Sequence, residues 1–166
     1  MGSFRDLIVY QKAFKLAMDI FKLTKNFPID EKYNLVSQIR NSSRSVCSSI
    51  AEGYRKRQYP AHFIAKISDA DMENSETQVW LDFSLSCKYI NKEIYKGYWD
   101  RSEEIGKLLN HMIRNPEKYN KILTANCLLQ IDDCEFIRNI LPSYSQRLCI
   151  HHCSSNHYQF YNRGRL

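Results

Sequence analysis

The sequence predicts an all-α protein, an antiparallel up-down four-helix bundle followed by a carboxyl-terminal extension. Five Gly and four Pro among 166 residues leave few points at which long helices would be interrupted. Apolar residues recur at spacings of three and four over long stretches, as in helices with one buried face. No apolar run approaches the length of a membrane span, and the amino terminus lacks a continuous apolar signal core. We therefore expect a cytoplasmic protein without a membrane partner.

The first two helices are predicted from residue 5 to residue 53. Phe27-Pro28 ends the first, because the residue before a proline is disfavoured in the α conformation. Its predicted core stripe consists of Leu7, Tyr10, Phe14, Ala17, Phe21 and Thr24. The second helix begins at about residue 31 to 33, with Gly53 as its carboxyl-terminal cap. Its predicted core residues are Leu35, Ile39, Ser43, Val46 and Ile50.

The third and fourth helices follow after short polar connections. Pro60 suits the first turn of the third helix, where its missing N–H would have no partner anyway. This helix is expected to run to about Lys88. Asn91 is a predicted amino-terminal cap of the fourth helix, which Asn115-Pro116 ends. Short links between four amphipathic helices indicate antiparallel neighbours.

The composition changes near Tyr119, so we divide the chain into a bundle domain, residues 1–118, and an extension, residues 119–166, that is no independent domain. The extension is expected to be helical in part, over Ile122 to Leu141, or disordered. It holds residue types that bind zinc, namely Cys127, Cys134, Cys149, His151, His152, Cys153 and His157. No CxxC pair occurs, however, and uncommitted thiols are the favoured interpretation. We expect no metal and no cofactor.

Positive charge is concentrated in the second helix and the turn after it. The whole chain has 24 Lys and Arg against 18 Asp and Glu, and residues 38–66 contain six basic residues and one acidic residue. If the helix continues far enough, Arg40, Arg44 and Arg55 lie within about 60 degrees of one another, clear of the core. Such a row can follow a nucleic-acid backbone, dock an acidic neighbour, or form a solvated face. The predicted nucleic-acid contacts are Arg40, Arg44, Arg55, Lys56 and Arg57.

Small side chains on the same helix indicate close packing, either within the bundle or between subunits. The predicted packing or oligomer contacts are Ser43, Cys47, Ile50, Ala51 and Gly53. An acidic patch on the third helix is expected to be a solvated face, or the docking counterpart of the Arg row on a neighbouring subunit. It consists of Asp69, Asp71, Glu73 and Glu76. The alternative function is therefore a structural scaffold or protein-interaction module whose Arg row makes subunit contacts, without nucleic-acid binding.

Nothing in the sequence indicates an enzyme. His62 and His111 are isolated, no Ser-His-Asp or Cys-His order can be interpreted, and no glycine-rich loop is present to hold a phosphate. We therefore expect no catalytic residues.

Residues from about 4 to 115 resemble a bacterial family of four-helix-bundle proteins encoded in 23S ribosomal RNA intervening sequences. That family is similar in turn to the accessory variability protein of diversity-generating retroelements. The resemblance is carried by Leu7, Val9, Tyr10, Ala13, Thr24, Phe27-Pro28, Glu31, Leu35, Gln38-Ile39-Arg40, Ser45, Ser49-Ile50-Ala51-Glu52-Gly53 and Glu104-Ile105-Gly106-Lys107-Leu108-Leu109-Asn110.

The resemblance implies an antiparallel bundle that assembles into a ring-like homo-oligomer, pentameric in relatives. It also implies a partner that is RNA or DNA and, from the retroelement relatives, a reverse transcriptase to which the protein is accessory. For the intervening-sequence members no role is established. The resemblance implies no enzymatic activity.

Overall fold

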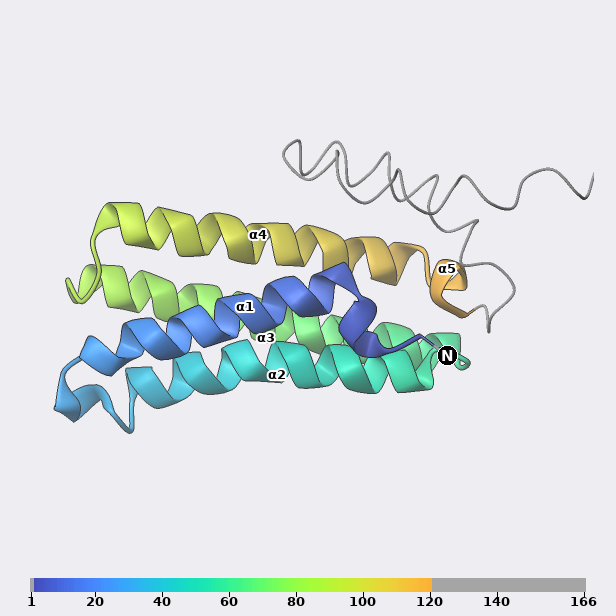
Figure 1. Cartoon of the computed structure of the whole chain (residues 1–166), viewed down its shortest axis with the longest axis horizontal. Helices are drawn as coiled ribbons and strands as arrows, with labels where there is room; N and C mark the ends of the chain where they lie inside the picture. The colour runs from blue at the N-terminus through green and yellow to red at the C-terminus, as the bar shows by residue number, and fades with distance from the viewer. Residues whose placement is uncertain (1, 121–166) are drawn as a thin grey trace, which may run out of the picture. The chain divides into compact units, whose positions relative to one another are not determined.

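The computed structural model describes residues 2–120, which fold into four long helices and several short ones. The long helices are α1 (Ile8–Leu23), α2 (Leu35–Lys56), α3 (Pro60–Ser86) and α4 (Lys92–Arg114). The short ones are η1 (Phe4–Asp6), η2 (Thr24–Asn26), η3 (Ile29–Glu31) and α5 (Glu117–Asn120). Neighbours along the chain pack against each other, and α1 also packs against α4 (Figure 1). The predicted all-α, antiparallel four-helix architecture is confirmed.

The helix ends follow from the local signals in the sequence. Phe27 has extended backbone angles, so the helical path of α1 and η2 stops before Pro28. Pro60 is the first residue of α3, as predicted. The carboxamide oxygen of Asn91 accepts a 2.8 Å hydrogen bond from the backbone N–H of Ile94, which caps α4. These residues fix where each helix can begin and end, and therefore the short links that make neighbours antiparallel.

The prediction that Gly53 caps α2 is wrong. The helix continues to Lys56, and Gly53 is a buried position inside it, with backbone φ in the ordinary negative range. A Cβ atom at this position would lie 2.9 Å from Cδ1 of Ile67 on α3, a side chain that is itself fully buried. The glycine is therefore required for the close approach of α2 and α3, not for a turn.

The predicted core face of the first helix is confirmed at Ala17 and Thr24 but is otherwise wrong, by about a quarter turn. The buried residues of α1 are Val9, Ala13, Leu16, Ala17 and Ile20, and Thr24 follows them in η2. Phe14 is 51% exposed, while Tyr10 and Phe21 are half-buried. Two adjacent faces of α1 are apolar, and the one with the smaller aliphatic side chains packs against α2 and α4. The bulky aromatic side chains consequently lie along the edge of α1.

The predicted core residues of the second helix are confirmed, and polar pairs complete the interior. Leu35, Ile39, Ser43, Val46 and Ile50 are all buried. Between α3 and α4, the Asn74 amide donates to the Ser102 carbonyl, and the Ser102 hydroxyl donates to Oδ1 of Asn74 at 2.9 Å. Each buried polar atom in this pair therefore has a partner, as burial requires.

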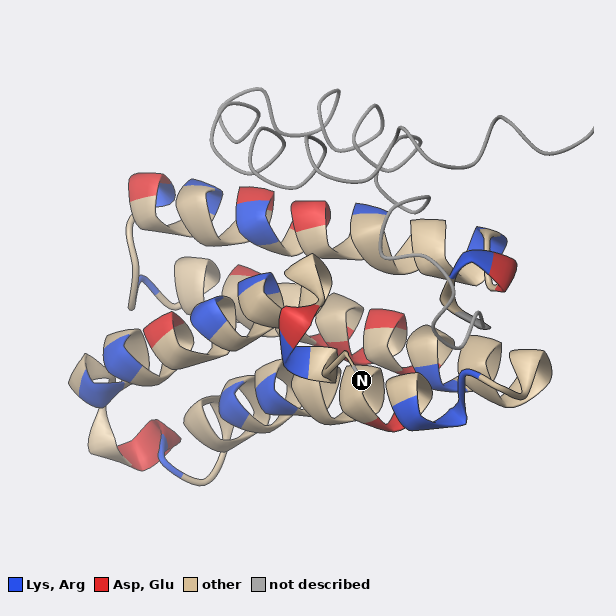
Figure 2. Cartoon of the chain, turned by 45° about the vertical axis from the view of Figure 1, so that its right-hand side comes forward, with Lys and Arg blue, Asp and Glu red and all other residues tan. Residues whose placement is uncertain are grey.

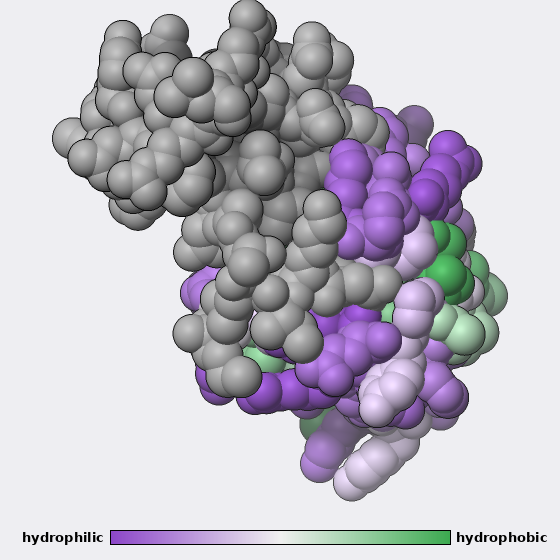
Figure 3. All heavy atoms as spheres, turned by 90° about the vertical axis from the view of Figure 1, so that its right-hand side faces the viewer, coloured by the Kyte–Doolittle hydropathy of each residue, from purple (hydrophilic) through white to green (hydrophobic). Residues whose placement is uncertain are grey.

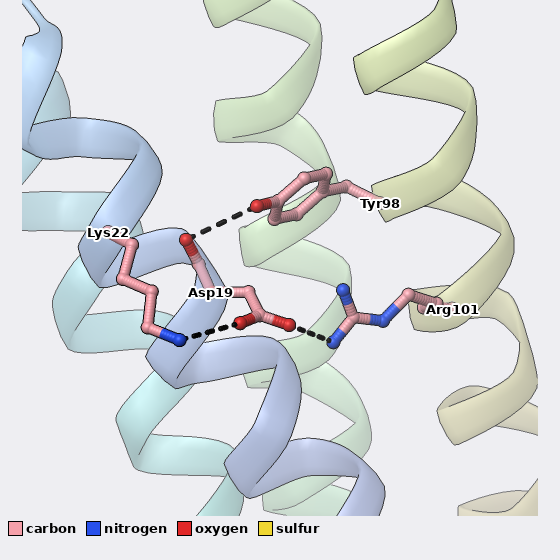
Figure 4. Close-up of polar contacts among 4 residues, drawn as sticks. All are labelled: Asp19, Lys22, Tyr98 and Arg101. Carbon is pink, nitrogen blue, oxygen red and sulfur yellow. Dashed lines mark hydrogen bonds and ion pairs between the residues drawn. The ribbon is translucent and has the colours of Figure 1, made fainter.

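A polar seam joins α1 to α4 (Figure 4). Asp19 receives an ion pair from Arg101 at 3.0 Å and a weaker one from Lys22 at 3.5 Å. The hydroxyl of Tyr98 donates to the backbone carbonyl of Asp19 at 3.2 Å. Asp19, the acidic residue of α1, therefore links α1 to α4 through Arg101 and Tyr98.

Several predictions fall outside the described residues. They include the fifth helix over residues 122–141, the tail cysteines and histidines, and the order of the extension. The division at residue 118 stays a prediction. Among residues 2–120, no helix is both long enough and apolar enough to cross a membrane.

Candidate nucleic-acid interface

Three cations surround one aromatic ring at the edge where α1 meets α2. The ring is that of Phe21, and Nζ of Lys25 lies 4.9 Å from its centroid. Cζ of Arg40 lies 4.9 Å from the same centroid and Cζ of Arg44 lies 5.6 Å from it. These distances are typical of cation–π contacts, which favour Arg over the electron-rich face of a ring. We call Phe21, Lys25, Arg40 and Arg44 the Phe21 cluster.

Arg40 is held rigidly within the Phe21 cluster. Its Nε–H donates a 2.8 Å hydrogen bond to the hydroxyl of Thr24, which itself donates to the Ile20 carbonyl. Half-burial lowers the pKa of Arg40, and the charge of Arg44 lowers it further. Arg40 is therefore only partly clear of the core: its guanidinium lies over Phe21 and donates to the buried Thr24, and the residue is half-buried.

No carboxylate in residues 2–120 forms an ion pair with Lys25, Arg40 or Arg44. The Phe21 ring and the Thr24 hydroxyl do not neutralise the charges of these three side chains. The Phe21 cluster is therefore a positively charged surface whose arrangement is set by contacts within the protein. The guanidinium groups of Arg40 and Arg44 retain N–H donors that reach no acceptor among the residues that the structure describes. Phosphate and carboxylate oxygens are the ligands that such donors bind most strongly.

The other three predicted basic residues form a second group at the carboxyl-terminal end of α2. Arg55 and Lys56 are exposed in the last helical turn, where positive side chains also stabilise the helix dipole. Arg57 donates from Nη1 to the Tyr54 carbonyl at 2.7 Å, and its Cζ lies 4.1 Å over the Tyr54 ring. Arg57 thus has a local capping role, whereas Arg55 and Lys56 face solvent. The coloured surface at this end of the bundle is mostly hydrophilic (Figure 3).

The two basic groups are separate along α2 (Figure 2). The helix is continuous from Arg44 to Arg55, a rise of about 16 Å. The amino-terminal segment lies near the second group, because the Tyr54 hydroxyl donates to the Gly2 carbonyl at 2.7 Å. The ring of Phe4 then meets that of Tyr10 edge-on, with centroids 4.9 Å apart. Phe4 of η1 and Tyr10 of α1 therefore lie between the second basic group and the rest of α1.

The small residues of α2 contribute mainly inside the bundle. Ser43, Ile50 and Gly53 are buried, so their surfaces are already used by neighbouring helices. Cys47 and Ala51 are half-buried, and burial raises the pKa of the Cys47 thiol to about 11. A thiol with that pKa is protonated at neutral pH, so Cys47 behaves as a small packing residue.

The acidic residues of α3 are engaged separately rather than as one group. Asp69 pairs with Lys66 at 3.2 Å, and Lys66 also reaches Glu52 on α2 at 3.0 Å. Asp71 accepts from the Asn110 amide of α4, and partial burial raises its pKa. No group of three or more His, Cys, Asp or Glu among residues 2–120 is arranged to hold a metal ion.

The sequence pattern does not assign Phe21 or Lys25 to the site. It predicts a core position for Phe21, because aromatic residues on a helical period usually lie in the core. The available signal was the spacing of four between Phe21 and Lys25, which places both side chains on one face of the chain's helical path. Only the packing of α2 on α1 reveals that Arg40 and Arg44 lie against the face that carries Phe21 and Lys25.

The family model of the 23S rRNA-intervening sequence protein matches residues 5–111 of the chain. The chain belongs to this family. The 23S rRNA-intervening sequence match includes α1, α2 and α3, and hence both basic groups.

A solved structure with a similar fold comes from Bacteroides thetaiotaomicron and is described as a protein of unknown function from the S23 ribosomal protein family. It is 32% identical to this 23S rRNA-intervening sequence family member, with a TM-score of 0.59. The similarity covers 64% of this chain and 96% of that one. No match was found among curated proteins.

Proposed function

We propose that the protein binds nucleic acid, RNA or DNA, through the surface where α1 meets α2, without catalysing a reaction. The observation that carries the proposal is the Phe21 cluster, in which three cations have no carboxylate partner among the described residues. A polyanion relieves the repulsion between them and supplies acceptors for the free N–H groups. Arg55 and Lys56 extend the positive surface, and the family name supports an RNA-linked role.

Phosphate binding has a measurable signature in its dependence on salt. The logarithm of the association constant falls linearly with the logarithm of the salt concentration, with a slope of about −0.9 for each duplex phosphate neutralised. We expect a slope of about −2 to −4 if the Phe21 cluster and part of the second group engage phosphates. Fluorescence anisotropy with a labelled structured RNA at increasing salt measures it. A slope near zero, or no binding at low salt, would contradict the proposal.

A second candidate function is assembly, and one observation favours it. The outward face of α3 carries Met72, Val79 and Phe83 at helical spacing, and these are 64%, 48% and 50% exposed. Exposed apolar residues that share a face are typical of protein contacts. We propose this face as a subunit contact of a homo-oligomer, with the ring-like pentamer of the resemblance as the expected form. A reverse transcriptase as a further partner rests on the resemblance alone.

Assembly through α3 predicts a change of mass when a charge is placed in that face. We expect Val79→Asp to lower the molar mass measured by light scattering, because a buried unpaired carboxylate opposes association. Ile29→Asp, at a 78% exposed residue of η3, is the matched control and should leave the mass unchanged. Equal masses for both variants and the unaltered protein would exclude this face as the contact.

A further inference from the structure

A row of apolar side chains runs along the edge of α1 toward the Phe21 cluster. Tyr10, Phe14, Met18 and Phe21 follow one another at spacings of three and four, so they share one face of the helix. Phe14 is 51% exposed and Met18 39% exposed. The rings of Tyr10 and Phe14 are nearly parallel, with centroids 6.1 Å apart and an angle of 22° between their planes. We call these four residues the aromatic edge.

Among residues 2–120, the charged side chains that lie over the rings of the aromatic edge and of Phe4 are all positive. Lys25, Arg40 and Arg44 lie at its far end around Phe21. At the near end, Cζ of Arg5 lies 4.7 Å from the centroid of Phe4, whose ring touches that of Tyr10. The carboxylate of Asp6 is turned back to the amino terminus, where it accepts from the backbone N–H of Ser3.

The other nearby acids are also directed elsewhere. Asp19 is committed to Arg101 of α4, and Glu52 to Lys66 of α3. A ligand along the aromatic edge therefore meets flat apolar surface between two positive ends. Such a ligand has to combine negative charge with exposed apolar groups.

Unpaired nucleic acid has this combination, and a duplex does not. In a duplex the faces of the bases are covered by their neighbours, and only phosphates and groove edges meet a protein side chain. In a single strand each base offers a free face, and proteins that bind such strands combine a positive groove with aromatic side chains on which bases stack. From Tyr10 to Phe21 the edge is about 16 Å long, so the phosphates of one strand can reach the Phe21 cluster while its bases meet Phe14.

We infer that this surface binds unpaired nucleic acid in preference to a duplex. Bases stack on Phe14 and Tyr10, and the Phe21 cluster holds the phosphates that follow. The inference rests on the proposed nucleic-acid function and adds the class of nucleic acid to it. A second copy of the chain is the other occupant that an exposed aromatic edge suits, but three uncompensated cations at one end oppose contact between identical surfaces.

The test compares Phe14→Ala with Ile94→Ala in the full-length chain. Ile94 is the matched control, because it is an apolar residue of α4 that is 37% exposed and belongs neither to the α1–α2 surface nor to the exposed face of α3. Anisotropy titrations use an oligothymidine strand and a blunt duplex of the same length at one salt concentration. We expect Phe14→Ala to weaken binding of the single strand about 5- to 150-fold, the range for one lost base stack. Duplex affinity and the salt slope should stay as in the unaltered protein, because Phe14 carries no charge.

Further variants separate stacking from folding. Phe14→Trp should keep or strengthen single-strand binding, because it retains a flat ring. Phe14→Leu keeps the apolar volume without the ring and should weaken binding as Phe14→Ala does, even if the alanine variant folds poorly. Circular dichroism checks the fold of each variant, and light scattering checks that all are compared in the same assembly state.

The contrary results point to different failures. Equal single-strand affinities for Phe14→Ala and Ile94→Ala would overturn the inference. An equal loss of single-strand and duplex affinity in Phe14→Ala would overturn it as well. Either result leaves phosphate binding by the cations intact. A fall in molar mass in Phe14→Ala alone would make the aromatic edge a subunit contact and overturn it too. Absence of binding to either probe by the unaltered protein would overturn the proposed function itself.

Discussion

Gly53→Leu is expected to destabilise the protein, whereas the same change at Gly97 should stabilise it. A Cβ at Gly53 lies 2.9 Å from Cδ1 of Ile67 and 3.4 Å from Cβ of Lys66, and Ile67 is fully buried. Leucine adds three more carbon atoms at this contact, so α2 and α3 have to move apart. Overpacking of a core costs about 1–3 kcal/mol.

Gly97 is the matched control because nothing lies within 4 Å of an added Cβ there. Both glycines are inside long helices, so both variants gain about 0.8–1 kcal/mol of helix propensity. The free energies of unfolding of the two variants should therefore differ by about 1–3 kcal/mol, with Gly53→Leu the less stable. Urea denaturation measures the difference. Equal stabilities would contradict a glycine-dependent close approach of α2 and α3.

Removing both α2 arginines of the Phe21 cluster is expected to weaken nucleic-acid binding strongly. In Arg40→Gln/Arg44→Gln two guanidinium groups are lost, and each charge-assisted hydrogen bond is worth about 1.5–3 kcal/mol. That corresponds to at least about a tenfold loss of affinity for each arginine that contacts a phosphate. The salt slope should become less steep by about 1.4–1.8, the contribution of two phosphates. Anisotropy titrations over a range of salt concentrations measure both quantities.

Two controls accompany the double variant. Lys107→Gln removes a charge from an exposed residue of α4, a helix that packs against α1 and α3, and should leave both quantities nearly unchanged. Arg40→Lys/Arg44→Lys keeps the charges and should retain most of the slope while losing affinity, because lysine lacks the planar fork. If the double glutamine variant and Lys107→Gln behave alike, the Phe21 cluster is not the binding site.

The fold was predictable because its signals are local. Pro28, Pro60 and Asn91 determine helix ends through their own backbone chemistry, and the apolar period of α2 needs no knowledge of its neighbours. The role of Gly53 was not predictable in this way. A glycine near a run of basic residues has the pattern of a helix cap, and only the distance to Ile67 reveals a close approach.

The candidate site was predictable only in part. The charge excess of α2 identified Arg40 and Arg44 from the sequence, since charge is visible without a structure. The aromatic ring that they share belongs to α1, whose core face the sequence misplaces because Val9 and Tyr10 begin two apolar stripes of similar strength. The choice between these stripes depends on which side-chain volumes fit against α2 and α4. It is a property of the assembled bundle and not of α1 alone.

The most direct test of the central claim, that nucleic acid lies along α1 and α2, is to map the contact itself. Ultraviolet crosslinking of the full-length protein to a labelled single strand, followed by mass spectrometry of the peptides, locates the residues that touch bases. We predict that adducts concentrate on peptides containing Tyr10, Phe14 or Phe21, and that they decrease in Arg40→Gln/Arg44→Gln. Adducts confined to α3, α4 or residues 121–166 would contradict the account.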